Sequence, residues 1–229
     1  MTLPETEHRP GRTMGPAARL ALGALLAVTL LQGLFEVTRE PIAEAKQRLL
    51  DQTLIDLLPA DTGNGRTDHF TLLAPDWLGS PLPMKVYRRG ATEHMPMVIE
   101  AVAPRGYAGD IRLLVGLDAP GQVRAARVIE HRETPGLGDA IEAEKSDWID
   151  QFERRQRSPG EVSAWRVDKD GGDFDTLAGA TITSRTLVET VQQVADLHVK
   201  HHSTLATAAP GSEVRLDRHA SLTARRDSE

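Results

Sequence analysis

A threonine set among small residues is the first group in this sequence that could do chemistry. Thr181 directly follows Ala178-Gly179-Ala180 and precedes a run with apolar residues at helical spacing, 187–195. Small neighbours leave a hydroxyl oxygen open to a ligand, and a helix start offers free N–H groups and a positive dipole end that stabilise a phosphate. The structural alternative is that a hydroxyl here caps the helix and Asp175 makes a turn.

A second stretch of small residues lies in Glu133-Thr134-Pro135-Gly136-Leu137-Gly138, just after a strand-like run that ends at His131. Proline and glycine favour a compact turn, and the amides of such a turn can face a flat ligand. The alternative is an ordinary turn, with His131 and Glu133 as surface residues.

Composition excludes several classes of function. A net charge of −6 and an aromatic content of 4% provide neither a basic surface nor stacking platforms, so we expect no nucleic acid partner. The absence of cysteine excludes thiolate iron–sulfur clusters, disulfides and covalent c-type haem within the chain. Redox chemistry would therefore need an organic cofactor or a non-thiolate metal site. The three histidines His198, His201 and His202 fit the end of a helix and receive no metal assignment.

The N-terminal region predicts a membrane anchor. Residues 17–37 are almost entirely apolar and would give about 31 Å of helix, enough to cross a bilayer, with Arg19 and Glu36 near the two interfaces. A cleavable signal peptide is the alternative, but no convincing small-x-small cleavage site follows the apolar run. Charges flanking the span are balanced, and Arg19 gives only a slight preference for a cytoplasmic N-terminus, residues 1–16.

The rest of the chain predicts an α+β fold, a mixed or antiparallel β-sheet with flanking helices. Pro41 would open an amphipathic connecting helix within residues 38–60, and residues 61–202 would form the soluble domain. Few large apolar residues follow His202, so residues 203–229 are predicted to be a disordered tail. Strands are expected at 70–73, 97–103, 111–117, 123–131 and 165–169, and helices at 147–155 and 183–199.

Taken together, HRETPGLGD at 131–139 and DTLAGATITS at 175–184 resemble a known family. With the upstream stretch 106–111, they look like the FMN-binding domain shared by the G subunit of the Rnf complex and the C subunit of the sodium-pumping NADH:quinone reductase. The resemblance covers residues 39–200, and SDWIDQF, Trp165 and KDGGDFD bring the chain closest to the Rnf G subunit.

The resemblance implies a covalent cofactor. In this family FMN is joined by a phosphoester to the threonine that corresponds to Thr181, and a flavin transferase that uses FAD attaches it. It would recognise Asp175, Gly179 and Ala180. Two positions depart from the family pattern, Ala178 and Ala140. The flavin ring would be lined by Glu133, Thr134, Pro135, Gly136, Leu137 and Gly138, with Lys169 as a cation near an anionic flavin, and no catalytic acid–base pair is required.

The function implied is electron transfer within a membrane complex that couples ferredoxin–NAD electron exchange to Na⁺ or H⁺ movement. Its partners would be the A, B, C, D and E subunits of the Rnf complex, in a bacterial inner membrane with the soluble domain in the periplasm. Two alternatives stay open: the C subunit of the sodium-pumping reductase, and a membrane-tethered binding or assembly module without redox chemistry, which would hold no flavin.

Overall fold

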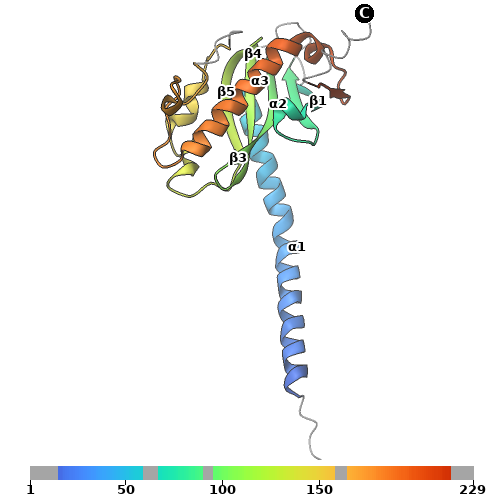
Figure 1. Cartoon of the computed structure of the whole chain (residues 1–229). Helices are drawn as coiled ribbons and strands as arrows, with labels where there is room; N and C mark the ends of the chain where they lie inside the picture. Colours follow the sequence, from blue (N-terminus) through green and yellow to red (C-terminus); the bar gives the residue numbers. More distant parts are fainter. Residues whose placement is uncertain (1–14, 59–66, 90–94, 158–163, 218–229) are drawn as a thin grey trace, which may run out of the picture. The chain divides into compact units, whose positions relative to one another are not determined.

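The chain divides into two units, Met1–Arg48 and Leu49–Glu229. A computed structural model describes residues 15–58, 67–89, 95–157 and 164–217. The described part of the first unit is helical and belongs to α1 (Pro16–Leu57), drawn in blue to cyan in Figure 1.

Helix α1 contains the predicted apolar segment. Within the described residues, one helix is long and apolar enough to cross a membrane, over Arg19–Leu57, and its apolar window is not buried. A polar group inside the apolar segment is satisfied within the helix, because the Thr29 hydroxyl donates to the Leu25 carbonyl at 2.8 Å. The expected start of a separate helix at Pro41 is wrong, since Pro41 lies inside α1. One proline removes a single backbone hydrogen bond, and here good helix formers continue the helix beyond it.

The second unit is built on one six-stranded sheet in the order β5-β4-β3-β2-β1-β6. Neighbouring strands are antiparallel except β6, which runs parallel to β1. The predicted α+β class with a mixed sheet is therefore confirmed. The strands are β1 (Thr67–Leu73), β2 (Met84–Arg89), β3 (Met97–Gly106), β4 (Gly109–Ala119), β5 (Gln122–Glu130) and β6 (Glu213–Arg215).

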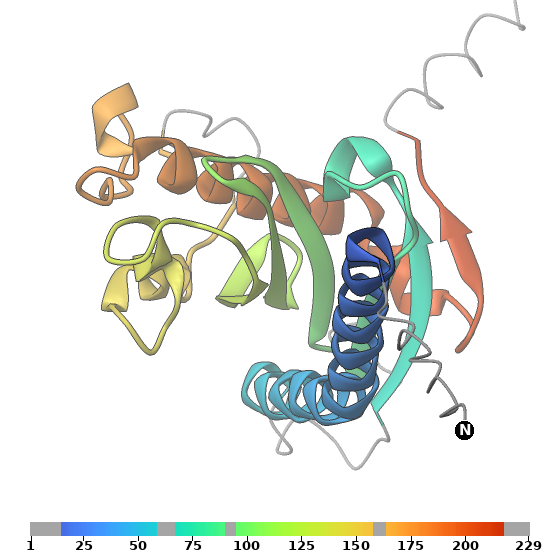
Figure 2. The same ribbon diagram turned by 90° about the horizontal axis from the view of Figure 1, so that it is seen from below.

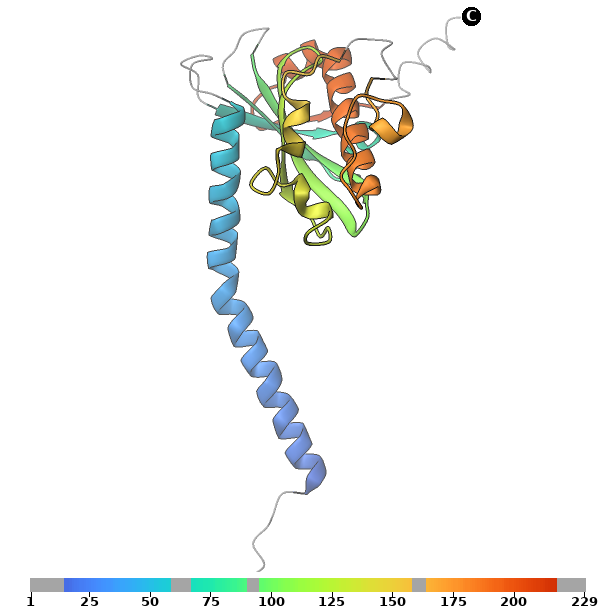
Figure 3. The ribbon, with the colours of Figure 1, turned by 90° about the vertical axis from the view of Figure 1, so that its left-hand side faces the viewer.

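Each face of the sheet is covered by a helix. Successive side chains of a strand point to opposite faces, so Leu113 and Val115 of β4 join the core under α3 (Thr181–Thr207), whereas Leu114 joins a smaller cluster with Leu57 at the end of α1. Figure 3 shows α3 and the cyan end of α1 on opposite sides of the sheet. Helix α2 (Pro75–Leu78) packs beside α3.

The carboxyl end of α3 is held by a buried arginine from β2. Arg88 is 5% exposed, and its guanidinium donates to the carbonyls of Leu205 at 3.1 Å and Ala208 at 2.6 Å. Its Nε also donates to Asp68 at 2.7 Å. The cation therefore satisfies carbonyls that the end of a helix leaves without partners.

The expectation of disorder from residue 203 onward is wrong for residues 203–217. Helix α3 continues to Thr207, and β6 then pairs with β1, with Thr71 N donating to Ser212 O at 2.9 Å. Pairing with an open sheet edge requires backbone groups more than large apolar side chains, which explains why composition missed it. Residues 218–229 lie outside the described residues.

Two further elements differ from the sequence prediction. The helix expected at 147–155 is a 3₁₀ helix, η3 (Asp147–Phe152), whose first turn is capped by Ser146. The strand expected at 165–169 is a loop with one isolated bridge between Val167 and Phe174, and it includes the short turn η4 (Asp168–Asp170). Figure 2 shows these segments, in yellow and orange, near the amino end of α3.

Candidate functional site

Thr181 is the first residue of α3, at the end of a loop of small residues. Gly179 has φ of +78°, a conformation that glycine adopts readily, and Ala180 N donates to the Leu177 carbonyl at 3.0 Å. The Ser184 hydroxyl closes the loop by accepting from Leu177 N at 3.0 Å. The small residues thus form a tight turn directly before the first residue of α3.

The amino end of α3 is left open for an anion. Ala180 is the N-cap residue and makes no side-chain cap bond, and the first turn contains no acidic residue. The first intrahelical bond runs from Ser184 N to Ala180 O at 3.0 Å, so the amides of Thr181 to Thr183 precede it. The alternative that Thr181 simply caps the helix is not what the geometry shows, because Thr181 lies inside the first turn.

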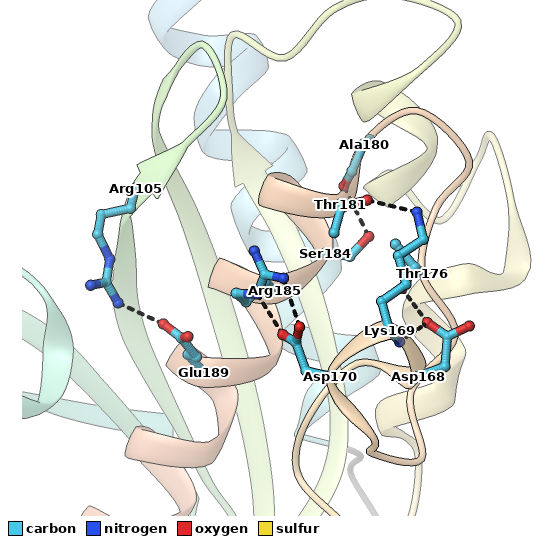
Figure 4. Close-up of polar contacts among 10 residues, drawn as sticks. All are labelled: Arg105, Asp168, Lys169, Asp170, Thr176, Ala180, Thr181, Ser184, Arg185 and Glu189. Carbon is cyan, nitrogen blue, oxygen red and sulfur yellow. Dashed lines mark hydrogen bonds and ion pairs between the residues drawn. The ribbon is translucent and has the colours of Figure 1, made fainter.

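Lys169 reaches the hydroxyl of Thr181 from η4. Its Nζ donates to Thr181 Oγ1 at 2.9 Å, as Figure 4 shows. Thr181 is half-buried and Lys169 is exposed, so both remain accessible from solvent. The structure therefore places a cation beside the hydroxyl that the sequence singles out.

The second predicted stretch folds into a tight turn. Thr134 O accepts from Leu137 N at 3.2 Å and from Gly138 N at 3.1 Å, and Gly136 has φ of +78°. The turn leads into the short 3₁₀ helix η2 (Gly138–Ile141). The prediction of a compact turn is confirmed.

Glu133 joins this turn to the start of α3. Its carboxylate, in a residue only 4% exposed, accepts from Thr183 Oγ1 at 2.6 Å and from Ala108 N at 3.0 Å. Space around it is tight, because a Cβ added at Gly138 would lie 2.8 Å from Glu133 Oε2. Glu133 is thus a buried brace between the two stretches and is not a surface residue.

A pocket of about 390 Å³ lies between the two stretches. Its rim is apolar, since Tyr107, Leu137 and Ile182 line it and are 70%, 47% and 49% exposed. Large apolar side chains left in water beside a pocket are typical of a ligand or partner surface. The lining residues are Tyr107, Glu133, Thr134, Leu137, Gly138, Gly179, Ala180, Thr181, Ile182 and Thr183.

Seven of the predicted site residues line this pocket: Glu133, Thr134, Leu137, Gly138, Gly179, Ala180 and Thr181. Pro135 and Gly136 lie on the same turn outside the lining, and Lys169 contacts the site through Thr181. Asp175 is exposed, and its backbone is fixed by bonds from Trp148 Nε1 and to Gln151 Oε1, both at 2.7 Å.

Sequence reasoning missed three of the lining residues, Tyr107, Ile182 and Thr183. Ile182 could have been predicted from the sequence, because it directly follows Thr181, and an isoleucine in the first turn of a helix beside a candidate site faces either the core or the ligand. Tyr107 lies 74 positions before Thr181, and its place beside the pocket follows from the β3–β4 hairpin, in which β3 ends at Gly106 and β4 begins at Gly109.

A cluster of polar side chains, formed by His131, Asp139, Glu142 and Lys145, lies next to the turn at residues 134–138. Lys145 donates to Asp139 at 2.9 Å and to Glu142 at 2.8 Å. Glu133 N donates to His131 Nδ1 at 3.0 Å, so that nitrogen carries no hydrogen and Nε2 donates to Glu142 at 2.8 Å. The hydrogen bonds from Lys145 hold the pKa of both carboxyl groups below their ordinary values, 3.8 for Asp139 and 4.5 for Glu142.

The cluster predicts a pH-dependent contribution to stability. Because the folded-state pKa of each carboxyl group is lowered, its stabilising effect is present above the ordinary pKa of 3.8 or 4.5 and is lost as the pH falls below it. Lys145→Met should therefore be less stable than the parent chain at neutral pH and should approach it as the pH falls below 4.5. Urea unfolding of both chains across this range measures the difference. A difference that stays constant in acid would contradict the prediction.

Comparisons with known proteins identify the family of this chain. A family profile described as FMN-binding domain matches residues 106–196, the region that contains both stretches of the pocket. Three similar proteins are named as G subunits of an ion-translocating oxidoreductase complex. The one from Shewanella baltica (strain OS223) is 40% identical over 176 residues, 76% of this chain and 83% of that protein. The one from Pseudomonas aeruginosa (strain UCBPP-PA14) is 38% identical over 77% of this chain and 84% of that protein. The one from Aliivibrio fischeri (strain ATCC 700601 / ES114) is 35% identical over 86% of this chain and 95% of that protein. The chain therefore belongs to the family of ion-translocating oxidoreductase complex G subunits and contains an FMN-binding domain.

Proposed function

We propose that this chain carries FMN as a phosphoester on Thr181 and relays electrons within an ion-translocating oxidoreductase complex. The observation that carries the proposal is the placement of the Thr181 hydroxyl: it lines a pocket at the amino end of α3, with the Lys169 ammonium 2.9 Å away. Bound FMN supplies the one- and two-electron redox chemistry that a chain without cysteine lacks.

The residues around Thr181 suit a phosphate group. Thr181 offers the oxygen for the ester, and the first-turn amides of α3 offer donors at the positive end of the helix dipole. The loop at Gly179 has no bulky side chain that would cover the oxygen. An anion held there meets donors and a cation, so the site fits a phosphoester.

The apolar rim suits the flavin ring. Tyr107, Leu137 and Ile182 offer flat or branched apolar surfaces that a planar ring would cover, removing them and itself from water. Thr134, Pro135, Gly136 and Gly138 belong to the turn that would line the ring, and polar groups of this turn would tune the potential of a bound flavin. Glu133 acts here by holding the turn against α3, because its carboxylate oxygens are engaged by Thr183 and Ala108.

Membership of the family supports a wider proposal about the partners of the chain. We propose that the partners are the A, B, C, D and E subunits of an Rnf-type complex, which couples ferredoxin–NAD electron exchange to ion movement. A flavin transferase that uses FAD would load Thr181 and recognise Asp175, Gly179 and Ala180. The relatives are named as G subunits, which favours this assignment over the C subunit of the sodium-pumping reductase.

We also propose that α1 anchors the chain in a bacterial inner membrane with the domain in the periplasm. Because the chain has no cysteine, single substitutions can report the side of the membrane without background. Ser203→Cys, in the domain, should react with a membrane-impermeant maleimide in cells whose outer membrane is permeabilised. Thr2→Cys, before the span, should react only after lysis. Labelling of Thr2→Cys alone in unlysed cells would mean the opposite orientation.

The covalent flavin is tested by locating it on the chain. The full chain is produced with and without a flavin transferase, separated on a denaturing gel and examined under ultraviolet light. We expect fluorescence only with the transferase. Trypsin should then release residues 170–185 with the mass of FMN less one water, and fragmentation should assign this mass to Thr181 and not to Thr176, Thr183 or Ser184. A dark band with a transferase that is active on another substrate would favour the binding-module alternative.

A further inference from the structure

The turn that carries Lys169 is built to hold one lysine in a fixed place. Gly171 ends η4 with φ of +79°, and Gly172 packs so closely that an added Cβ would lie 2.1 Å from the Arg166 carbonyl. The loop is closed by a bond from Phe174 N to Arg166 O at 3.1 Å. Such a tight loop restricts the direction in which the Lys169 side chain leaves the backbone.

The acidic residues on either side of Lys169 are occupied by other donors. Asp168 accepts from the amide of Lys169 at 2.7 Å and from the Thr176 hydroxyl. Asp170 forms a two-pronged ion pair with Arg185, at 2.5 and 2.8 Å. Figure 4 shows Asp170 and Asp168 on either side of Lys169, whose ammonium extends toward Thr181. The ammonium of Lys169 thus donates its hydrogen bond to the Thr181 hydroxyl, while both neighbouring carboxylates accept from other groups.

A single hydrogen bond to a neutral hydroxyl contributes too little free energy to offset the conformational entropy lost when an exposed lysine side chain is ordered. The arrangement becomes favourable when the oxygen carries negative charge, because hydrogen bonds to charged groups are stronger. Thr181 Oγ1 would carry such charge during esterification, and its phosphodiester would carry one negative charge afterwards.

We propose that Lys169 is the positioning and charge-compensating residue for the attachment of FMN, an inference that rests on the proposed function of Thr181. In the transfer, Thr181 Oγ1 bonds to the flavin-side phosphorus of FAD. The pyrophosphate P–O bond breaks, AMP leaves, and the hydroxyl proton passes to a base of the transferase. The ammonium of Lys169 takes no proton. It orients the oxygen, stabilises the charge that develops there, and then pairs with the phosphodiester.

The test is the rate at which the full-length chain is loaded by the transferase and FAD, followed by in-gel fluorescence. Lys169→Met should load about tenfold more slowly or worse, since removing one donor to a developing negative charge has effects of at least this order. The lower rate should appear as a lower kcat of the transferase acting on this chain, with its KM for FAD unchanged. Lys169→Arg keeps the charge and should recover most of the rate.

A matched control is Lys200→Met, which removes a different lysine whose ammonium lies over the Trp77 ring, 5.5 Å from its centroid. It should load at the parental rate. All variants should show the parental unfolding temperature, which separates positioning from folding. Parental loading of Lys169→Met, or an arginine variant as slow as the methionine variant, would overturn the inference while leaving Thr181 as the flavin site. Failure of the parent chain itself to load would instead overturn the proposed function.

Discussion

Replacing Thr181 by valine is expected to abolish covalent flavin completely while leaving the chain folded. Valine keeps the branched shape of threonine but has no oxygen to bond to phosphorus. The variant loses the hydrogen bond from Lys169, which is exposed, to Thr181, which is half-buried. Water can accept from the Lys169 ammonium instead, so the loss should change the free energy of unfolding little. The variant should give a dark band on a denaturing gel where the parent chain is fluorescent, and electron transfer through the complex should stop at this point.

Thr181→Ser provides the positive control. Serine retains the oxygen and loses only a methyl group, so it should still be loaded, though more slowly because its side chain has more freedom. Two other hydroxyls lie close by in the first turn, on Thr183 and Ser184. Fluorescence that persists in Thr181→Val would mean that one of these carries the flavin and that the assignment to Thr181 is wrong.

Removing the carboxylate of Glu133 is expected to have the largest effect on stability. In Glu133→Ala two donors, Thr183 Oγ1 and Ala108 N, lose their acceptor, and Thr183 is fully buried. Water can replace the acceptor of the exposed Ala108 amide, but the Thr183 hydroxyl is buried, and an unsatisfied buried donor costs about 1–3 kcal/mol in the free energy of unfolding. The unfolding temperature of the full chain in detergent should fall by roughly 2–12 °C.

Glu130→Ala is the matched control, because Glu130 is an exposed acid whose ion pair with Arg112, at 3.3 Å, is open to solvent. Such pairs contribute little, and the free energy of unfolding should change by less than about 1 kcal/mol. Glu133→Gln keeps one oxygen acceptor and should fall between the two. Equal stability of Glu133→Ala and Glu130→Ala would show that the two stretches of the pocket do not depend on this brace.

The parts of the fold that can be predicted from the sequence are those with regular apolar spacing. The β4–β5 hairpin and the long helix α3 each carry such a pattern. Strand β2 cannot be recognised in this way, because its sequence, MKVYRR, reads as charged. Arg88 in that strand is buried among oxygen partners that are distant in sequence, and no local pattern indicates those partners.

The candidate site divides in the same way. The sequence singles out Thr181 and the turn around Gly136, because small residues and a helix start are local features. It does not indicate that Glu133 binds Thr183, 50 positions away, or that Lys169 donates to Thr181 across 12 positions. These contacts depend on how the sheet and α3 bring separate segments together.

The clamp of Arg88 on the far end of α3 gives the helix an electrical asymmetry. At the carboxyl end a buried guanidinium neutralises the partial negative charge by bonding to Leu205, Ala206 and Ala208. At the amino end no acidic side chain in the first turn offsets the partial positive charge. The partial negative charge at the carboxyl end, which lies beyond a kink at His201, is therefore offset by a side chain, whereas the partial positive charge beside Thr181 is left for a ligand.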